Sequence, residues 1–243
     1  TICFIPARAG SKRIKDKNIQ PLYNYNPIEQ RIAHAFDQGR CPTFNLIQHQ
    51  FAMAIQFKGG FNQIVFSSES ESYLQHLNMR AEHYIKTQAL ANIPNKPYFL
   101  FHDRPNELAK DTTSTQDVIE HFLLTKQATL PCRLILWQPT SPFREVSIHN
   151  QAMNSVTKSS PFTRIERHVP HTNINVPTGS FYGWYLEYPN DIHKLKIPTT
   201  VLTTSDRLEC IDIDEPQDLE IARLIASSAM YNKNYIQPAK WSG

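Results

Sequence analysis

Short apolar runs that end at polar loops alternate with helix-like segments along the chain, and this alternation constrains the fold more than any other feature. Strand-like runs occupy residues 1–7, 63–67 and 133–137 in the first part of the chain and residues 180–185 and 208–213 in the rest. This order predicts an α/β fold of three layers, in which a mainly parallel, twisted sheet carries helices on both faces. Sheets of this kind bind ligands beyond the carboxyl ends of their strands.

Helical patterns separate several of these runs. Apolar residues recur at helical spacing over residues 27–38, after the predicted N-cap Ser114, and after Pro216. Residues 150–178 are the most irregular stretch, and we expect them to leave the main sheet. Residues 39–62 and 78–103 show only weak periodicity and receive no assignment.

Length and composition favour one globular domain over residues 1–243, with 40% hydrophobic and 19% charged residues. The net charge of +3 gives no argument for nucleic acid as a partner. No stretch approaches the roughly 20 apolar residues that cross a bilayer, and the first residues lack the plan of a signal peptide, so we expect a cytoplasmic protein without a membrane partner. The four cysteines are widely spaced, which favours core positions for Cys3 and Cys132 over a zinc site or a disulfide.

The loop after the first run places five Lys or Arg residues within ten positions, from Arg8 to Lys17. Cations, hydroxyls and a glycine that lets the backbone approach closely are the groups that hold phosphates. A solvated basic turn is the alternative. The candidate phosphate and nucleotide ligands in this loop are Arg8, Gly10, Ser11, Lys12, Lys17 and Asn18.

Two prolines stiffen a polar loop that follows residues 133–137 and reads Gln138-Pro139-Thr140-Ser141-Pro142-Phe143-Arg144. Gln138 carries both a donor and an acceptor, so it could read the edge of a nucleobase. Ser141 and Arg144 are candidate substrate ligands. An ordinary rigid turn is the alternative reading of this loop.

Near the end of the chain, acidic and apolar residues alternate in the sequence Asp212-Ile213-Asp214-Glu215-Pro216. On a strand, Asp212 and Asp214 would face the same way, and neighbouring carboxylates that accompany phosphates suit Mg2+. The alternative for Asp214 is that it caps the helix that begins near Pro216.

A further polar stretch precedes the helix after Ser114. It runs from Arg104 to Thr115 and combines an arginine, acids and hydroxyls. Taken alone, it is more typical of a helix cap than of a site. Among the ten histidines, which have no metal-ligand spacing, only His168 and His171 in the irregular region merit attention as site residues.

These motifs, in this order, resemble those of the CMP-sialic acid synthetases, or acylneuraminate cytidylyltransferases, and of their relatives for pseudaminic, legionaminic and Kdo sugars. The matching stretches are P-A-R-x-G-S-K-x-x-x-x-K-N at 6–18, R-P-x-x-L-A-x-D-x-T-S-T at 104–115, Q-P-T-S-P-x-R at 138–144 and D-I-D-x-P-x-D-L at 212–219. The similarity extends along nearly the whole chain.

The resemblance implies that the anomeric hydroxyl of a nonulosonic acid sugar attacks the α-phosphate of CTP, so that pyrophosphate leaves with the help of Mg2+. Arg8, Lys12, Lys17 and Asp214 would then be catalytic, with Asp212 and Asp214 as metal ligands. The nucleotide would bind at Arg8, Gly10, Ser11, Lys12, Asn18, Ser67 and Gln138, and the sugar at Arg104, Ser141 and Arg144. Charge and position alone, without the resemblance, make Arg164, Arg167 and His168 candidate partners for the sugar carboxylate. The resemblance also implies a homodimer, formed through an excursion over residues 145–180.

Three departures from the family pattern weaken the choice of acceptor. The usual S-T-D-S reads Ser67-Ser68-Glu69-Ser70, and the usual N-G reads Thr178-Gly179. The N-G-K-P turn is only echoed at residues 24–27. A Kdo-type synthetase and a catalytically inactive nucleotide-binding homologue therefore remain alternatives, whereas nucleic-acid binding through the basic loop is disfavoured.

Overall fold

The computed structural model describes residues 1–24, 43–57, 60–75, 77–78, 81–82, 97–125, 127–228 and 234–236. The helix predicted over residues 27–38 lies outside these ranges.

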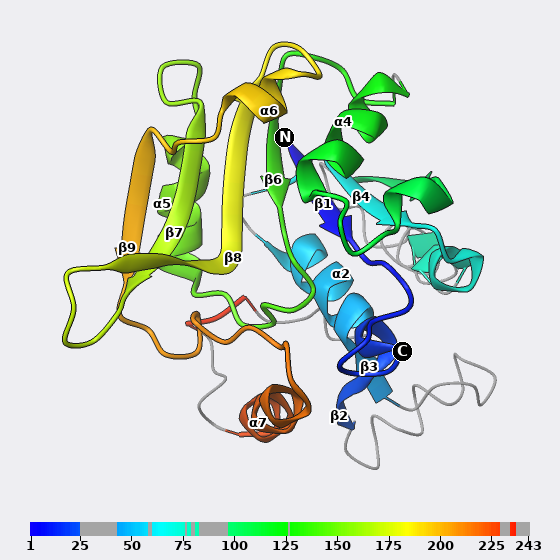
Figure 1. Cartoon of the computed structure of the whole chain (residues 1–243), viewed down its shortest axis with the longest axis vertical. Helices are drawn as coiled ribbons and strands as arrows, with labels where there is room; N and C mark the ends of the chain where they lie inside the picture. The colour runs from blue at the N-terminus through cyan, green and yellow to red at the C-terminus, as the bar shows by residue number, and fades with distance from the viewer. Residues whose placement is uncertain are drawn as a thin grey trace, which may run out of the picture.

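A seven-stranded sheet forms the centre of the molecule, in the order β5-β4-β1-β6-β8-β7-β9 (Figure 1). The strands β5, β4, β1 and β6 are parallel, β8 is antiparallel to β6 and β7, and β9 is parallel to β7. The bounds are β1 (Ile2–Pro6), β4 (Gln63–Ser68), β5 (Tyr98–Asp103), β6 (Cys132–Leu136), β7 (Phe162–His168), β8 (Asn175–Leu186) and β9 (Thr200–Thr204). A two-stranded antiparallel sheet joins β2 (Pro21–Asn24) to β3 (Thr43–Asn45).

Helices cover both faces of the sheet. Alternate residues of β1 point to opposite faces, so each set packs against different helices. Cys3 and Ile5 pack in one core cluster with residues of α2 and α5, whereas Ile2 and Phe4 pack in another with residues of α4 and α6. The predicted three-layer α/β fold is therefore confirmed. The helices of the described ranges are α2 (Leu46–Gln56), α4 (Thr115–Leu124), α5 (Val146–Ser155), α6 (Asp191–Lys194) and α7 (Pro216–Ala226), with 3-10 turns η1 (Lys17–Ile19) and η2 (Asn106–Leu108).

Two helix boundaries agree with their predicted signals. Ser114 caps α4: its hydroxyl accepts from the Asp117 amide while the Asp117 carboxylate accepts from the Ser114 amide. Pro216 is the first residue of α7, a position in which its missing N–H costs nothing. Cys3 and Cys132 are buried, as predicted.

Residues 150–178 are more regular than expected. They contain most of α5, all of β7 and the start of β8, and β7 lies inside the main sheet between β8 and β9. Polar residues obscured the pattern because β7 carries Arg164, Glu166 and Arg167 among its apolar positions.

Residues 208–213 do not form the predicted strand; the last strand within the described ranges is β9. The Asp206 carboxylate accepts from the amides of Leu208 and Glu209, which folds this segment into a turn. Its apolar residues Leu208 and Ile213 are still buried, because they pack against α7 in a third core cluster. Within the described ranges, none of the helices has the length and apolar character that crossing a membrane requires.

Candidate active site

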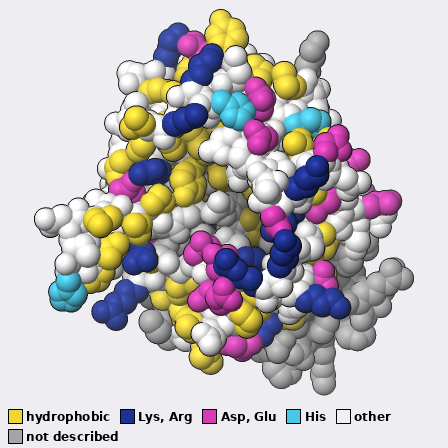
Figure 2. Space-filling view, viewed as in Figure 1, with side chains coloured by type: hydrophobic (Ala, Val, Ile, Leu, Met, Phe, Trp, Pro, Cys, Tyr) yellow, Lys and Arg dark blue, Asp and Glu magenta, His cyan; other side chains and the backbone are white. Residues whose placement is uncertain are grey.

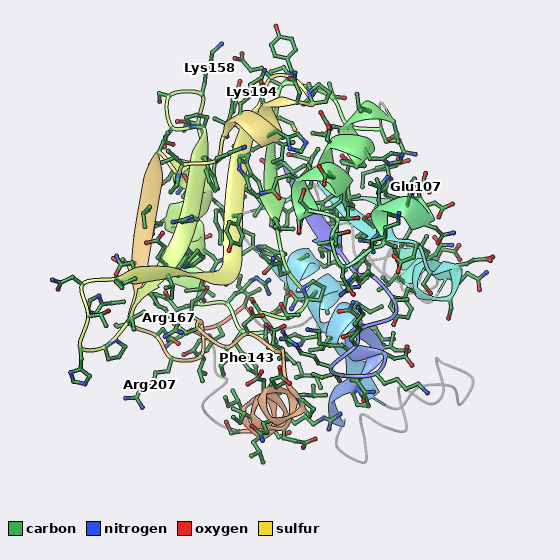
Figure 3. The ribbon with its side chains drawn as sticks, in the orientation of Figure 1. Glu107, Phe143, Lys158, Arg167, Lys194 and Arg207 are labelled. Carbon is green, nitrogen blue, oxygen red and sulfur yellow. The ribbon has the colours of Figure 1, made fainter. Side chains whose placement is uncertain are left out.

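The predicted motif loops gather at one end of the sheet. β1, β4, β5 and β6 are parallel, so the loops that follow their last residues emerge on the same side. Figure 3 shows Phe143, Arg167 and Arg207 at this end, with Lys158 and Lys194 at the opposite end.

A cavity of about 230 Å³ lies among these loops. Basic and acidic side chains lie side by side next to a hollow on this face of the molecule (Figure 2). The cavity is lined by residues of three separate sequence motifs: Pro6, Arg8, Ser11, Lys17 and Asn18; Arg104, Leu108, Lys110, Asp111, Thr113, Ser114, Thr115 and Val118; and Gln138, Pro139 and Thr140.

Two cations of the first loop share one carboxylate. Asp111 accepts from Lys12 Nζ and from an Arg8 guanidinium nitrogen, each at 2.5 Å. The hydrogen bond from Lys12, which has the larger effect, and the hydrogen bond from Arg8 hold the pKa of Asp111 below its ordinary value. The sequence interpretation did not select Asp111 as a site residue, although it stands at a defined position of the 104–115 motif.

Lys17 connects the first loop to the aspartates near the end of the chain. Its ammonium group donates to the carbonyl oxygen of Ile213 at 2.7 Å and lies 3.2 Å from the Asp214 carboxylate. Arg13 lies 3.8 Å from the other oxygen of Asp214. Asn18 supports the loop from within, because its side chain is buried and donates to the Arg8 carbonyl oxygen. The two ends of the sequence therefore meet at this site.

Asp212 lies beside the cavity-lining residue Thr140, whose hydroxyl it contacts. The carboxylate keeps an exposed side, but surrounding protein removes much of its hydration, and this desolvation raises its pKa. The Thr140 contact opposes the rise, and the charge of Asp214 adds to it. Two neighbouring carboxylates thus carry an unfavourable interaction that a cation would relieve.

Asp214 does not cap α7. Glu215 is the N-cap residue of α7, and the carboxylate of Asp218 in the first turn accepts from the amides of Asp214 and Glu215 at 3.0 and 2.7 Å. The side chain of Asp214 is more than half exposed and is directed toward the cations of the first loop.

Glu69, a departure from the family pattern, ties the first loop to the 104–115 motif. Its carboxylate accepts from the Ala9 amide at 2.6 Å and from Arg104 at 2.5 Å. Burial lowers the pKa of Arg104, and the charge of Glu69 opposes this effect. Arg104 lines the cavity in this orientation.

Ser67 differs from its predicted role as a nucleotide ligand. Its side chain is fully buried, and its hydroxyl shares a 2.9 Å hydrogen bond with His102. Burial, with contributions from His121 and Arg104, lowers the pKa of His102 to about 4, so this ring is neutral near pH 7. Ser67 therefore joins the end of β4 to β5 inside the protein, through its hydrogen bond with His102.

Arg144 also has a structural position and not the predicted contact with substrate. It is fully buried, donates to the carbonyl oxygens of Gln138, Ser141 and Ser180, and lies 4.6 Å from the centre of the Trp137 ring. Its planar fork fixes the shape of the 138–144 loop. In this arrangement the guanidinium is buried, and Arg144 is not among the residues that line the cavity.

Ser141 is likewise buried and lies against β8 at Gly179. A Cβ placed on Gly179 would lie 2.9 Å from Ser141 Oγ, 3.2 Å from Gln138 Oε1 and 3.7 Å from Asp212 Oδ2. The backbone at Gly179 has φ of +82°, which favours glycine. Gly179 therefore lets β8 approach both the 138–144 loop and Asp212.

Changing Gly179 to Ala should destabilise the protein and disturb the site. The positive φ costs about 1–2 kcal/mol for a residue with a Cβ, and the crowded position adds about 1–3 kcal/mol. Gly60→Ala is the matched control, since Gly60 has φ of +70° but no atom of the described residues lies within 4 Å of the position that an added Cβ would take. Equal losses in the free energy of unfolding for both variants would show that the packing contribution is absent.

Arg164 lies on β7 outside the residues that line the cavity, and it pairs with the buried Glu166. Burial raises the pKa of the neighbouring Tyr182, whereas Arg164 lowers it and Asp212 and Glu166 raise it further. Arg164 is thus within electrostatic range of the same tyrosine as Asp212. His168 is farther along β7 and shares a hydrogen bond with Asn175.

The described residues contain no group of three or more His, Cys, Asp or Glu side chains arranged to hold a metal ion. A cation at Asp212 and Asp214 would need further oxygen ligands, such as phosphate oxygens and water, which is the usual arrangement for Mg2+.

Comparison with known proteins identifies the fold. No family model and no curated protein matches the sequence. Among solved structures, a CMP:2-keto-3-deoxy-manno-octonic acid synthetase complexed with CTP matches with a TM-score of 0.55 and 13% identity, over 93% of this chain and 98% of the other. The 4-diphosphocytidyl-2C-methyl-D-erythritol synthase of Anaerococcus prevotii DSM 20548 matches with a TM-score of 0.51 and 8% identity, over 93% and 96% of the two chains. At these identities the likeness shows a shared fold.

Proposed function

We propose that this protein is a cytidylyltransferase that transfers CMP from CTP to a nonulosonic acid sugar of the sialic, legionaminic or pseudaminic type and releases pyrophosphate. The observation that carries the proposal is the meeting of the cationic first loop with Asp214, through Lys17, next to a cavity that Arg8, Arg104 and Gln138 also line. The names of the solved neighbours, one of them complexed with CTP, support the cytidylyl-transfer part of the proposal.

The first loop would bind the triphosphate. Arg8 and Lys12 now pair with Asp111, and Lys17 pairs with Asp214. Each of these ion pairs has at least one partly exposed partner, so a more highly charged phosphate can replace it at little cost. Lys17 is the most enclosed of the three cations, since its side chain is only 13% exposed.

Asp212 and Asp214 would hold Mg2+ together with phosphate oxygens. Their hard oxygen donors and their mutual repulsion fit a divalent cation. A bound Mg2+ supplies neutralisation of the charge that develops on the phosphates. Asp111 is a further carboxylate, and it lines the cavity itself.

The base would occupy the cavity between the first loop and α4. Leu108 and Val118 provide apolar surface there, whereas Arg104, Thr113 and Gln138 provide donors and acceptors. A nucleobase needs both, namely faces that pack and an edge that is read by hydrogen bonds. Gln138 remains the amide we propose for reading cytosine.

In-line displacement at the α-phosphate leaves little covalent work to side chains. The residues of the site bind, orient and neutralise charge, and these effects account for most of the acceleration in such reactions. The described geometry needs no protein nucleophile for this chemistry.

Arg164 is the proposed ligand of the acceptor carboxylate, with Arg167 nearby on β7. The exposed side of Arg164 would exchange part of its contact with Glu166 for a planar, bidentate contact with the sugar acid. We further propose a homodimer, which light scattering coupled to gel filtration would test.

Pyrophosphate release in the presence of CTP, Mg2+ and a panel of acceptors tests the proposed function. We expect release with at least one nonulosonic acid, and none when UTP replaces CTP or when the acceptor is omitted. CTP binding without pyrophosphate release from any acceptor would leave only the nucleotide-binding homologue. Release with Kdo alone would assign the sugar to the sibling class.

Asp212→Asn should separate stability from activity. A carboxyl whose folded-state pKa is raised binds protons more tightly in the native chain, so its ionisation destabilises the fold as pH rises above the ordinary range near 4. We therefore expect the variant to have a higher thermal midpoint than the parent at pH 7, an advantage that shrinks toward pH 3. With CTP present, Mg2+ should stabilise the parent more than the variant. A lower midpoint for the variant at pH 7 would contradict this account of Asp212.

A further inference from the structure

A buried acid lies three residues before Asp212 and takes no part in the proposed chemistry. Glu209 has no exposed surface, and its carboxylate accepts from two groups near the start of α5. One oxygen is 2.7 Å from His149 Nε2, and the other accepts from the Glu145 amide at 2.6 Å. His149 is also fully buried, with aromatic contacts to Trp137 and Phe181.

These two bonds join elements that carry different parts of the site. α5 begins directly after the 138–144 loop, and Glu209 belongs to the turn that leads to Asp212 and Asp214. A buried carboxylate with both oxygens engaged holds its surroundings in one arrangement, since breaking either bond leaves a desolvated polar group unpaired.

The far end of the same turn is fixed at the cavity. The Ile213 amide donates to the Thr140 carbonyl oxygen at 2.8 Å, and the Ile213 carbonyl accepts from Lys17. Only three residues, the last of them Asp212, separate Glu209 from Ile213, so a displacement of Glu209 would also displace Asp212. The backbone around Asp212 is therefore fixed on one side by the bonds of Glu209 and on the other by those of Ile213, which directly precedes Asp214.

We propose that Glu209 is a positioning residue that, through its buried bonds to α5, sets the affinity of Asp212 and Asp214 for a divalent cation. The inference rests on the proposed metal role of the two aspartates. Support of metal ligands by residues that do not touch the metal commonly changes metal affinity by 10- to 100-fold.

Mn2+ serves as the probe, because electron paramagnetic resonance measures its free concentration without any turnover. We would titrate it into the full chain with and without one equivalent of CTP, for the parent, Glu209→Gln and the control Glu187→Gln. In Glu209→Gln the new side chain keeps the shape of the old one but has only one acceptor oxygen for two donors. Glu187 is a half-exposed acid that pairs with Lys158 at the opposite end of the sheet.

We expect Glu209→Gln to weaken Mn2+ binding about tenfold or more, with CTP affinity in the absence of metal changed less than threefold and Glu187→Gln unchanged. A purely structural role for Glu209 would lower the thermal midpoint but leave Mn2+ affinity as in the parent, and that result would overturn the proposal. If the parent itself binds no Mn2+ beyond that bound by free CTP, the metal role in the proposed function fails as well.

If Glu209→Gln does not fold, variants of His149, the hydrogen-bond partner of Glu209, test the same proposal. His149→Gln keeps a donor for Glu209, so its Mn2+ affinity should stay within about threefold of the parent, whereas His149→Phe should show the loss. Equal affinities for these two variants would overturn the proposal. The expected split between them identifies the bond, and not the size of the side chain, as the cause.

Discussion

Asp214→Asn is expected to slow pyrophosphate release about a thousandfold, at the upper end of the 10²- to 10³-fold losses that follow removal of one stabilising group from a preorganised site. The change keeps the shape of the side chain and removes the charge that we propose for metal binding. The Asp214 side chain is more than half exposed, and the Asp218 contact that begins α7 uses the Asp214 backbone amide, which the variant retains. Folding stability should therefore stay within about 0.5 kcal/mol of the parent.

Initial rates at saturating CTP and acceptor, with Mg2+ varied, provide the measurement for Asp214→Asn. Glu187→Gln is the control, since it makes the same chemical change in an ion pair at the other end of the sheet. A variant that retains even a tenth of the parent rate would remove Asp214 from the proposed metal site.

Arg8→Ala is expected to lower kcat/KM for CTP about a hundredfold, which is within the range for loss of one charge-stabilising group. Arg8 lines the cavity, and its removal both deletes a phosphate contact and leaves Asp111 with Lys12 alone. Arg8→Lys should recover part of the loss, because the ammonium keeps the charge but not the planar fork.

The control for Arg8 is Lys158→Ala, which removes an exposed cation that pairs with Glu187 far from the cavity. Its kcat/KM should match that of the parent. If Arg8→Ala raises neither KM nor the dissociation constant for CTP, the first loop does not bind the triphosphate.

Of the parallel strands β1, β4, β5 and β6, three could be predicted from the sequence because they are buried and end at polar loops, whereas β5 lies within residues 78–103, which show only weak periodicity. The runs at residues 1–7, 63–67 and 133–137 correspond to β1, β4 and β6. α2 could not be predicted in the same way. Residues 46–54 of this helix are all buried, the polar Gln48, His49 and Gln50 among them, so it lacks the separate apolar and solvent-exposed faces by which a surface helix is predicted.

Residues 208–213 were misread for a related reason. Their apolar pattern reflects burial against α7, and periodicity alone does not distinguish a buried turn from a buried strand. The turn depends on the Asp206 carboxylate, which hydrogen-bonds to the amides that follow it. Asp212 lies close to the 138–144 loop because of this turn and because Gly179, which has no Cβ, leaves room between them.

The motifs identified the loops of the site but not the role of each side chain within them. Arg144, Ser141 and Ser67 have the chemistry of ligands, yet they are fully buried and shape the loops from beneath. Burial is a property of the folded chain and has no signature in a polar loop sequence. Glu69 stands where the family pattern S-T-D-S has an aspartate, which weakens the sequence match. In the folded protein its longer side chain reaches the Ala9 amide and Arg104.

A crystal structure of the protein with CTP and Mg2+ tests the central claim most directly. We expect the triphosphate to lie against Arg8, Lys12 and Lys17, with density for a cation between its oxygens and the carboxylates of Asp212 and Asp214. Nucleotide bound at another face of the molecule, or a triphosphate directed away from both aspartates, would contradict the account.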